Sequence, residues 1–381
     1  MLAIIAGIIT LLIWLWLLLA HGGFWRVRRF MALPRNSDLA AKIAVIIPAR
    51  DEAEVVGRCI SSLLRQTYRG PVHIFLVDDG SKDGTAQAAR QAAERSGKTS
   101  ALTIIQGAPP PSGWSGKLWA AQQGIRRARE LGARFFLLTD ADIEHAPESI
   151  STLAAIAESG GYDLASYMVK LHCITFAERL LIPAFVFFFF KLYPASWIAN
   201  PRRKTAGAAG GCILIRPQAL ERAGGIEAVR SEIIDDCALA KAVKQSGGRV
   251  WLGVTELASS IRPYGAFAGI AQMISRSAFS QLHHSAFMLL LAMAGLIATY
   301  LLPPVLLFAG HSLPALLGAT AWLLMIIAYM PMIRFYRLTP LWTLFLPVVA
   351  IFYMGATLHS AIKYWRGRGG EWKGRVQDPA R

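Results

Sequence analysis

The chain has 381 residues, of which 54% are hydrophobic and 17% charged, and its formal net charge at pH 7 is +16. This composition is too apolar for a purely soluble protein, and the apolar residues are concentrated toward the two ends of the chain. The excess of basic residues does not indicate nucleic-acid binding. Many of these residues flank apolar segments, where they would contact anionic lipid headgroups.

The first apolar segment, residues 2–20, is long enough to cross the roughly 30 Å hydrocarbon core of a bilayer as a helix. Arg26, Arg28 and Arg29 follow this segment, whereas a cleavable signal peptide carries its positive charge before the apolar run. We therefore expect residues 1–22 to be a retained transmembrane anchor. The positive charges place its C-terminal flank in the cytoplasm.

Between residues 40 and 280, apolar runs of strand length alternate with stretches of helical character. The first four runs cover residues 42–49, 73–79, 101–107 and 134–140. Near-continuous apolar strands separated by helices predict an α/β domain with a doubly wound, mostly parallel sheet covered on both faces. Ligands of such sheets bind at the carboxyl ends of the strands, which is where the motifs PARDE, DDGSKDGT and TDADI lie.

Paired acids end two of these strands. Asp78 and Asp79 end one strand, and Asp140 and Asp142 follow another. Alternate residues of an extended segment point to the same side, so we expect Asp140 and Asp142 to face one ligand. Carboxylate oxygens suit Mg²⁺ or Mn²⁺, and these ions are usually held by one or two carboxylates together with substrate phosphates. The motif therefore predicts a divalent metal and a diphosphate in the same pocket.

Two further motifs suit an anionic ligand. Residues 113–117 (GWSGK) open a helix after a proline-rich loop, so backbone N–H groups and the Lys117 ammonium can cradle a phosphate. A serine N-cap beside a solvated lysine is the alternative interpretation. Gly210 and Gly211 are expected to allow close approach of a donor sugar or an acceptor, because glycine has no Cβ atom.

The motifs, taken in their order, resemble those of the family two glycosyltransferases of the GT-A fold. The resemblance covers roughly residues 40–280. It rests on PARDE at 48–52, VDDGSKDGT at 77–85, TDADI at 139–143, GAAGGCILIRPQAL at 207–220 and IIDDCALA at 233–240. It implies an enzyme that transfers a sugar from a nucleotide-diphosphate sugar.

The resemblance also implies roles for the acids of the first three motifs. It places the base and ribose of the donor beside Pro48, Asp51 or Glu52, and Asp79. Asp140 would lie near the ribose or sugar, and Asp142 would bind the metal together with Asp140. The implied cofactor is a divalent ion, Mg²⁺ or Mn²⁺.

The acidic pair near the end of the domain implies the mechanism. By resemblance Asp236 is the catalytic base and Asp235 lies on the acceptor side. Adjacent carboxylates resist double ionisation, which would raise the pKa of Asp236 and suit it to this role, although acids at a helix N-terminus are also expected from the helix dipole alone. The metal with Arg276 or Lys117 would neutralise the leaving diphosphate. One in-line displacement without an enzyme nucleophile inverts the anomeric centre.

Within the family the chain is most similar to the membrane-bound branch, and above all to the hopene-associated glycosyltransferases. This closer resemblance rests on GWSGKLWA at 113–120, GGC at 210–212, IIDDCALA at 233–240 and WKGR at 372–375. The branch often has a Gln/Arg-x-x-Arg-Trp motif, whereas residues 273–277 read Met-Ile-Ser-Arg-Ser. Arg276 can still face a diphosphate, but the missing Trp weakens a polysaccharide-synthase interpretation.

The remaining apolar segments predict the membrane topology. Residues 180–198 are expected to lie in the membrane interface, because the apolar run is short and interrupted by Pro183 and Lys191. Residues 285–362 are expected to hold three membrane segments, at 286–309, 313–333 and 341–362. The basic tail, 363–381, favours the cytoplasm, so the last segment is expected to turn back at Pro347 and Gly355. The alternative is three crossings and an external tail.

The sequence thus predicts a multi-pass enzyme of the bacterial inner membrane with its catalytic domain in the cytoplasm. The expected partners are a nucleotide-sugar donor, for which UDP-sugar is favoured, and a lipid acceptor, for which a hopanoid is favoured. Ceramide, carotenoid or polyprenyl phosphate are the alternative acceptors. A non-catalytic membrane scaffold is the alternative of a different class. An oxidoreductase is disfavoured because the GxGxxG fingerprint is missing, and a transporter because the apolar segments lack intramembrane charges.

Overall fold

The structure is a computed structural model that describes residues 1–34, 40–309 and 311–369. The chain divides into two compact units. The sheet unit consists of Phe30–His172 and Trp197–Arg262, and the helical unit of Met1–Arg29, Cys173–Ser196 and the chain from Pro263 onward. Two segments expected within the catalytic domain, around residues 180–198 and 263–280, therefore group mainly with the apolar helices.

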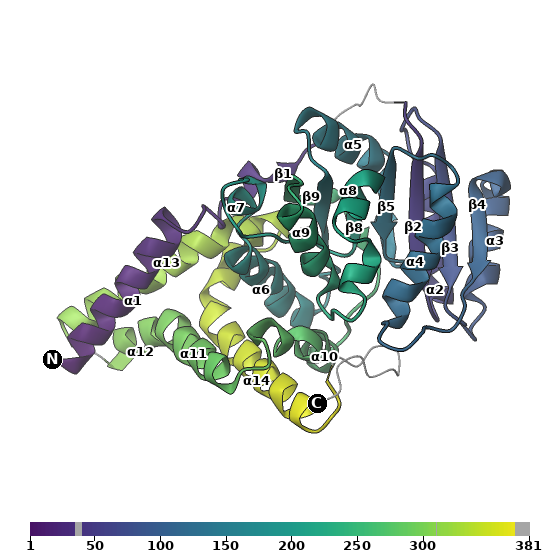
Figure 1. Ribbon diagram of the computed structural model, residues 1–381. Helices are drawn as coiled ribbons and strands as arrows, with labels where there is room; N and C mark the ends of the chain where they lie inside the picture. The colour runs from purple at the N-terminus through teal and green to yellow at the C-terminus, as the bar shows by residue number, and fades with distance from the viewer. Residues whose placement is uncertain (35–39, 310, 370–381) are drawn as a thin grey trace. The chain divides into compact units, whose positions relative to one another are not determined.

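Nine strands in the described part of the sheet unit form one mixed sheet, in the order β1-β9-β7-β8-β5-β2-β3-β4 with β6 paired to β9 (Figure 1). The strands are β1 (Met31–Ala32), β2 (Ile43–Ala49), β3 (Val72–Asp78), β4 (Leu102–Gln106), β5 (Phe135–Thr139), β6 (Ile143–His145), β7 (Leu164–Lys170), β8 (Cys212–Ile215) and β9 (Val250–Ser260). β8 runs antiparallel to β5 and β7, and β6 antiparallel to β9, while the other pairs are parallel.

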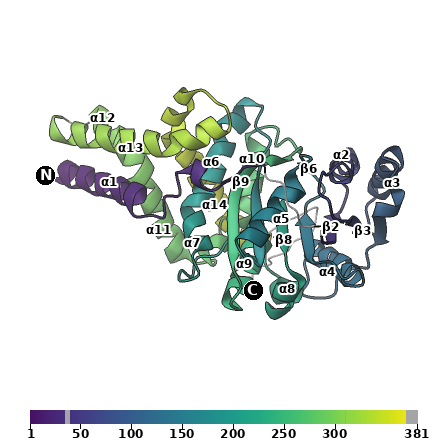
Figure 2. The same ribbon diagram turned by 90° about the horizontal axis from the view of Figure 1, so that it is seen from above.

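Helices cover both faces of this sheet. They are α2 (Ala53–Leu64), α3 (Thr85–Arg95), α4 (Gly116–Arg129), α5 (Ser149–Ser159), α8 (Pro217–Arg222) and α9 (Asp235–Gln245), with α7 (Ala195–Ala199) at the boundary of the unit. Figure 2 shows α2 and α3 on one side of β2 and β3, and α4 on the other. The predicted doubly wound, mostly parallel α/β fold is confirmed.

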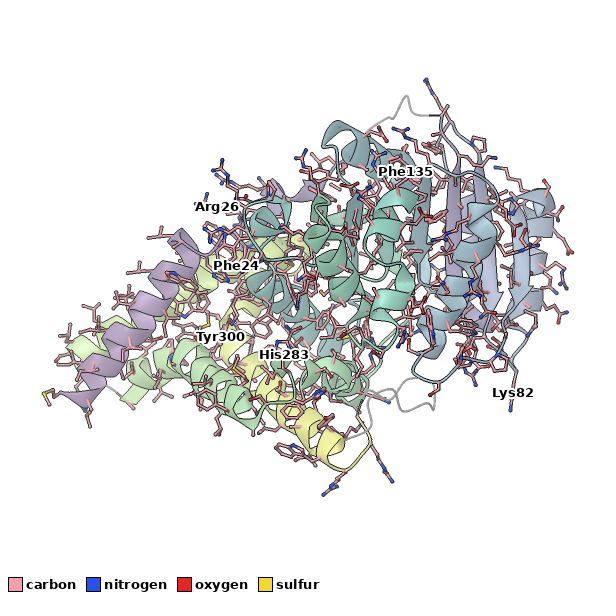
Figure 3. All side chains as sticks on the ribbon, viewed as in Figure 1. Phe24, Arg26, Lys82, Phe135, His283 and Tyr300 are labelled. Atoms are coloured by element: carbon pink, nitrogen blue, oxygen red, sulfur yellow. The ribbon has the colours of Figure 1, made fainter. Side chains whose placement is uncertain are left out.

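The strand sequences explain why both faces are covered. Val45 on β2 belongs to the core beneath α2, α3 and α5, whereas its neighbour Ile46 faces α4. Both side chains are fully buried, as is Phe135 on β5 (Figure 3). A strand buried on both faces has no polar side to alternate with, which is why its sequence is a continuous apolar run.

The helical unit contains α1 (Leu2–Leu19), α6 (Phe176–Leu192), α10 (Phe267–Ser277), α11 (Ala286–Leu296), α12 (Leu302–Ala309), α13 (Leu313–Phe335) and α14 (Leu346–Trp365). Among the described residues, five helical stretches are long and apolar enough to cross a membrane: Leu2–Leu19, Phe176–Ala199, Ala286–Ala309, Leu313–Phe335 and Pro340–Trp365. The predicted N-terminal and C-terminal apolar helices are therefore present.

The segment expected to lie in the membrane interface is more buried than its sequence suggests. Helix α6 begins at Phe176 with a capping box, in which the Thr175 side chain and Glu178 satisfy each other's backbone N–H groups. It continues through Pro183. Phe187 is 1% exposed and packs against Phe24, which is labelled in Figure 3, and against Tyr329. This face of α6 therefore contacts protein, and the position of the helix relative to a bilayer stays a prediction.

The last apolar segment also differs from expectation. We expected Pro347 and Gly355 to let the chain turn back within 341–362, but α14 is one continuous helix from Leu346 to Trp365. Pro347 lies in the first turn, where the missing N–H group of proline costs no hydrogen bond. Gly355 lies inside the same helix, where glycine, unlike proline, keeps its backbone N–H group. The WKGR motif lies outside the described residues.

Candidate functional site

The loops that follow β2 and β3 hold each other at the carboxyl edge of the sheet. Asp51 takes a left-handed conformation with φ of 51°, and its carboxylate accepts a hydrogen bond from the backbone N–H of Lys82 at 2.9 Å. The backbone N–H of Glu52 donates to the hydroxyl of Thr85 at 2.8 Å. The Lys82 side chain itself extends away from the unit (Figure 3). The motifs PARDE and VDDGSKDGT therefore form one structural element.

Asp79 belongs to this element and is only 5% exposed. Its carboxylate lies 3.5 Å from Nη1 of Arg50, and the same guanidinium donates to the backbone carbonyl of Asp79 at 2.6 Å. Arg50 was not among the predicted site residues, although it lies inside the PARDE motif. The arginine therefore supplies positive charge beside a buried acid.

The Asp-x-Asp segment is a turn and not the extended strand that we expected. Its Ala141 and Asp142 are turn residues, and the backbone N–H of Ile143 donates to the carbonyl of Asp140 at 3.3 Å. The two carboxylates consequently have different cationic partners. Asp140 pairs with Nζ of Lys117 at 2.8 Å, and Asp142 accepts from Nε of Arg262 at 3.0 Å. The expected extended geometry is therefore wrong, and the shared ligand of Asp140 and Asp142 stays a prediction.

Six of the predicted residues line one pocket on the side of the sheet that α4 and α9 cover. They are Pro48, Lys117, Asp140, Gly210, Asp235 and Asp236. The apolar part of the wall comes from β2, β5 and β8 and from the two helices, for example Ile46, Leu138 and Leu239. The fold thus brings together residues that are far apart in the sequence.

Asp236 is an acid of this pocket with a raised pKa. It lies in the first turn of α9, and its two oxygens accept hydrogen bonds from the backbone N–H groups of Gly210 at 2.8 Å and Cys237 at 2.7 Å. Burial, followed by repulsion from Asp235, raises the pKa of Asp236 to about 6. A carboxyl group with this pKa is a competent base near neutral pH and retains affinity for the proton that it removes.

Lys117 is the cation of the pocket. Ser115 caps the N-terminus of α4 by accepting from the N–H of Leu118, which fixes the helix start at Gly116, one residue before the lysine. The Lys117 ammonium lies 2.8 Å from Asp140 and 3.8 Å from Asp235. It therefore connects the motif expected to bind the donor with the motif expected to supply the base.

The two glycines have different surroundings. A Cβ atom on Gly210 would lie 3.4 Å from Nζ of Lys117 and 3.5 Å from Oδ2 of Asp236, so the missing side chain leaves this part of the pocket open. A Cβ atom on Gly211 would lie 3.0 Å from Val169. Gly211 does not line the pocket, and a side chain there would crowd Val169. The expected contacts of both glycines with a sugar or acceptor stay predictions.

Two arginines lie in different units of the chain. Arg262, which sequence analysis missed, forms ion pairs with Glu52 and Asp142 just after β9. In the sequence Arg262 is only a basic residue before Pro263, and no motif marks it as part of a site. Arg276, which we expected beside the diphosphate, lies on α10 in the helical unit. The sheet unit therefore does not contain it, and its role stays a prediction.

The chemistry of the donor set fits a divalent ion that shares its coordination with a substrate. No group of three or more His, Cys, Asp or Glu residues in the described chain is arranged to hold a metal by itself. Asp140 and Asp142 offer carboxylate oxygens, and their side chains are 35% and 20% exposed. Mg²⁺ and Mn²⁺ are commonly bound by one or two carboxylates plus phosphate oxygens, which this pair can provide.

Residues 44–224, just under half of the chain, match the sequence model described as Glycosyl transferase family 2. The chain is 31% identical over 128 residues to the undecaprenyl-phosphate 4-deoxy-4-formamido-L-arabinose transferase of Pseudomonas savastanoi pv. phaseolicola. This match covers 32% of this chain and 34% of that protein. It is 32% identical over 87 residues to the 4,4'-diaponeurosporenoate glycosyltransferase of Staphylococcus aureus, covering 23% of this chain and 20% of the relative. The matches span only about a third or less of these relatives.

The structure is also similar to a solved structure, the mannosyltransferase PcManGT from Pyrobaculum calidifontis in complex with GDP-Man and Mn²⁺. The TM-score is 0.54 at 19% sequence identity, and the match covers 92% of this chain and 98% of that chain. At this identity the likeness establishes the fold, so the predicted GT-A fold is confirmed. The family match and the relatives support glycosyltransferase activity.

Proposed function

We propose that this chain is a membrane-bound glycosyltransferase that moves a sugar from a nucleotide-diphosphate sugar to the hydroxyl group of a lipid, with inversion at the anomeric carbon. The observation that carries the proposal is the environment of Asp236. This acid has a raised pKa and is oriented by the Gly210 N–H group, in a pocket that also contains Lys117 and Asp140.

Asp236 is the base of the proposed reaction. Its carboxylate takes the proton of the acceptor hydroxyl while the acceptor oxygen bonds to the anomeric carbon and the diphosphate departs with the electrons of the broken bond. The hydrogen bonds from Gly210 and Cys237 hold the carboxylate in one orientation. This orientation converts the proton transfer into a step within a preassembled complex, which lowers the entropic cost of reaching the transition state.

The leaving diphosphate needs positive charge, and Lys117 is positioned to supply it. Its ammonium already lies among Asp140 and Asp235, so a diphosphate entering the pocket would meet a cation held in place by two acids. A divalent ion bound at Asp142 and Asp140 would add Lewis-acid stabilisation of the same leaving group. Arg276 remains a candidate for a further contact.

The donor nucleotide would lie along the joined loops after β2 and β3. Their acids, Asp51, Glu52 and Asp79, are the groups for its base and ribose, while Pro48 lines the pocket where the loops begin. We infer a UDP-sugar as donor from the family resemblance. GDP-Man is bound by the similar solved mannosyltransferase, so a GDP-sugar is the second candidate.

A lipid acceptor follows from the apolar helices. Five described stretches are long and apolar enough to cross a membrane, and a catalytic unit attached to such helices stays close to the bilayer. The names of the two relatives include undecaprenyl phosphate and diaponeurosporenoate, both of them lipids. We propose a hopanoid as the acceptor, with polyprenyl phosphate, carotenoid and ceramide as alternatives, and the bacterial inner membrane with a cytoplasmic sheet unit as the location.

Lipid profiling identifies the acceptor. A strain that lacks this gene is expected to lose one glycosylated lipid and to accumulate the same lipid without its sugar, relative to the parent strain. Expression of the wild-type chain should restore the product, and expression of the Asp236→Asn variant should not. A missing glycosylated hopanoid supports the proposed acceptor, whereas a missing glycosylated polyprenyl phosphate selects the alternative. If the lipids are unchanged while a protein or polysaccharide loses its sugar, the lipid acceptor is wrong.

A further inference from the structure

Arg262 links two acids that belong to different motifs. Its Nε atom donates to Oδ2 of Asp142 at 3.0 Å, and its Nη2 atom forms a close ion pair with the carboxylate of Glu52. The side chains of Glu52 and Asp142 are only 12% and 20% exposed. The Arg262 side chain is 38% exposed, so solvent reaches the guanidinium while it holds the two more buried carboxylates.

The fold places Arg262 at this position through its backbone. Strand β9 ends at Ser260, which pairs with Ile143 of β6. The next backbone N–H group, that of Ile261, donates to the carbonyl of Asp142 at 2.9 Å. The backbone next to Arg262 is thus bonded to the turn that carries Asp142. This backbone contact keeps the guanidinium near the Asp142 carboxylate.

We propose that Arg262 serves as the counter-cation of Asp142 while no donor is bound, and that Asp142 accepts a divalent metal ion only after a donor diphosphate has drawn the guanidinium away. This inference rests on the proposed function, since it requires a metal ion at Asp142. A carboxylate beside a guanidinium is a poor ligand for a second cation, because the two positive charges repel each other and compete for the same oxygens. The planar guanidinium also matches a phosphate group with two parallel hydrogen bonds.

The consequence is that metal and nucleotide bind cooperatively. If the diphosphate moves Arg262 from Asp142, it must strengthen metal binding, and the metal must strengthen nucleotide binding by the same factor. The free enzyme would then bind the metal weakly. The metal would be retained mainly when a donor or product diphosphate occupies the pocket.

The inference is tested by measuring the affinity of the full-length protein in detergent for Mn²⁺. Electron paramagnetic resonance reports binding as a loss of the signal of the free ion. Without nucleotide, the Arg262→Gln variant is expected to bind Mn²⁺ about tenfold more tightly than the wild type, since hydrogen bonds to charged groups are worth about that factor or more. Addition of UDP, or of GDP in a parallel titration, should tighten binding to the wild type and reduce the difference between the two proteins.

Two further variants make the result specific. Arg58→Gln removes an exposed arginine that pairs with Glu144, two residues after Asp142, and it should leave Mn²⁺ affinity unchanged. The double variant Arg262→Gln with Asp142→Asn should lose the gain, which would locate the additional Mn²⁺ affinity at Asp142. If Arg262→Gln does not fold, Arg262→Lys replaces it, because lysine lacks the planar fork that contacts both acids and should still give a gain of a few fold.

The outcomes separate this inference from the proposed function. Equal Mn²⁺ affinities of the wild type and the folded Arg262 variant without nucleotide, together with normal binding in the presence of UDP or GDP, would overturn the inference and leave the proposed function intact. Failure of every variant to bind Mn²⁺ with either nucleotide would instead contradict the metal site of the proposed function.

Discussion

Replacement of Asp236 by Asn is expected to lower kcat for sugar transfer by about 10³-fold, within the range typical for the loss of a general base. The affinity for the nucleotide sugar should stay within a few fold of the wild type. The reason is that the base acts on the acceptor hydroxyl in the transition state, while donor binding depends on the other acids. Initial rates with labelled donor and calorimetric titration of the nucleotide measure the two effects separately. A variant that retains more than about a tenth of wild-type turnover would exclude Asp236 as the base, because even a modest general base contributes more than this.

The pH dependence supplies an independent control. The base must be ionised to act, so kcat/KM of the wild type should fall as the pH drops through about 6, the pKa of Asp236, and should be constant above it. The charge of Asp235 contributes to this raised pKa. The Asp235→Asn variant should therefore shift the fall to lower pH. An unchanged midpoint in this variant would show that another group controls the profile.

Replacement of Asp142 by Ala is expected to remove the metal dependence of donor binding. With Mn²⁺ present, the affinity for UDP or GDP should fall by at least about tenfold to a hundredfold, since changes even to the outer-shell partners of metal ligands have effects of this size. Without Mn²⁺ the variant and the wild type should bind the nucleotide similarly. Glu144→Gln is the matched control, because Glu144 follows the same motif but pairs with the exposed Arg58. If Mn²⁺ strengthens nucleotide binding to Asp142→Ala as much as it strengthens binding to the wild type, Asp142 is not a ligand of the metal.

The sequence predicts the sheet well because its central strands have only one possible environment. Val45 and Ile46 are adjacent and both fully buried, so their run of apolar residues requires cover on both faces. The acids at the strand ends then follow from topology, since parallel strands present their carboxyl ends at one edge. The position of Asp236 at the start of a helix was also predictable from its acidic motif, and its role as the base stays a prediction.

The features that the sequence did not predict depend on contacts between distant segments. Arg262 pairs with residues 210 and 120 positions earlier in the chain, Glu52 and Asp142, so no local pattern marks it. The Asp-x-Asp segment has a composition compatible with both a strand and a turn, and the hydrogen bond between Ile143 and Asp140 shows which of them forms.

The packing of the apolar segments in the helical unit also depends on contacts between distant residues. Hydropathy identifies a segment that avoids water, but it does not distinguish a face that contacts lipid from one that contacts protein. Phe187 is buried against two aromatic rings from other parts of that unit, which its own neighbourhood in the sequence could not reveal. Pro347 and Gly355 likewise have no fixed effect on a helix, because the effect depends on their position within it.

The most direct measurement is sugar transfer by the purified full-length chain in lipid vesicles. The vesicles would contain hopanoid, polyprenyl phosphate, carotenoid or ceramide, each tested with labelled UDP-sugars and GDP-sugars in the presence of Mn²⁺ or Mg²⁺. We predict that label appears in one lipid, with the anomeric configuration opposite to that of the donor, and that the Asp236→Asn protein transfers none above background. Transfer that is unaffected by Asp236→Asn, or a product that keeps the configuration of the donor, would contradict the account.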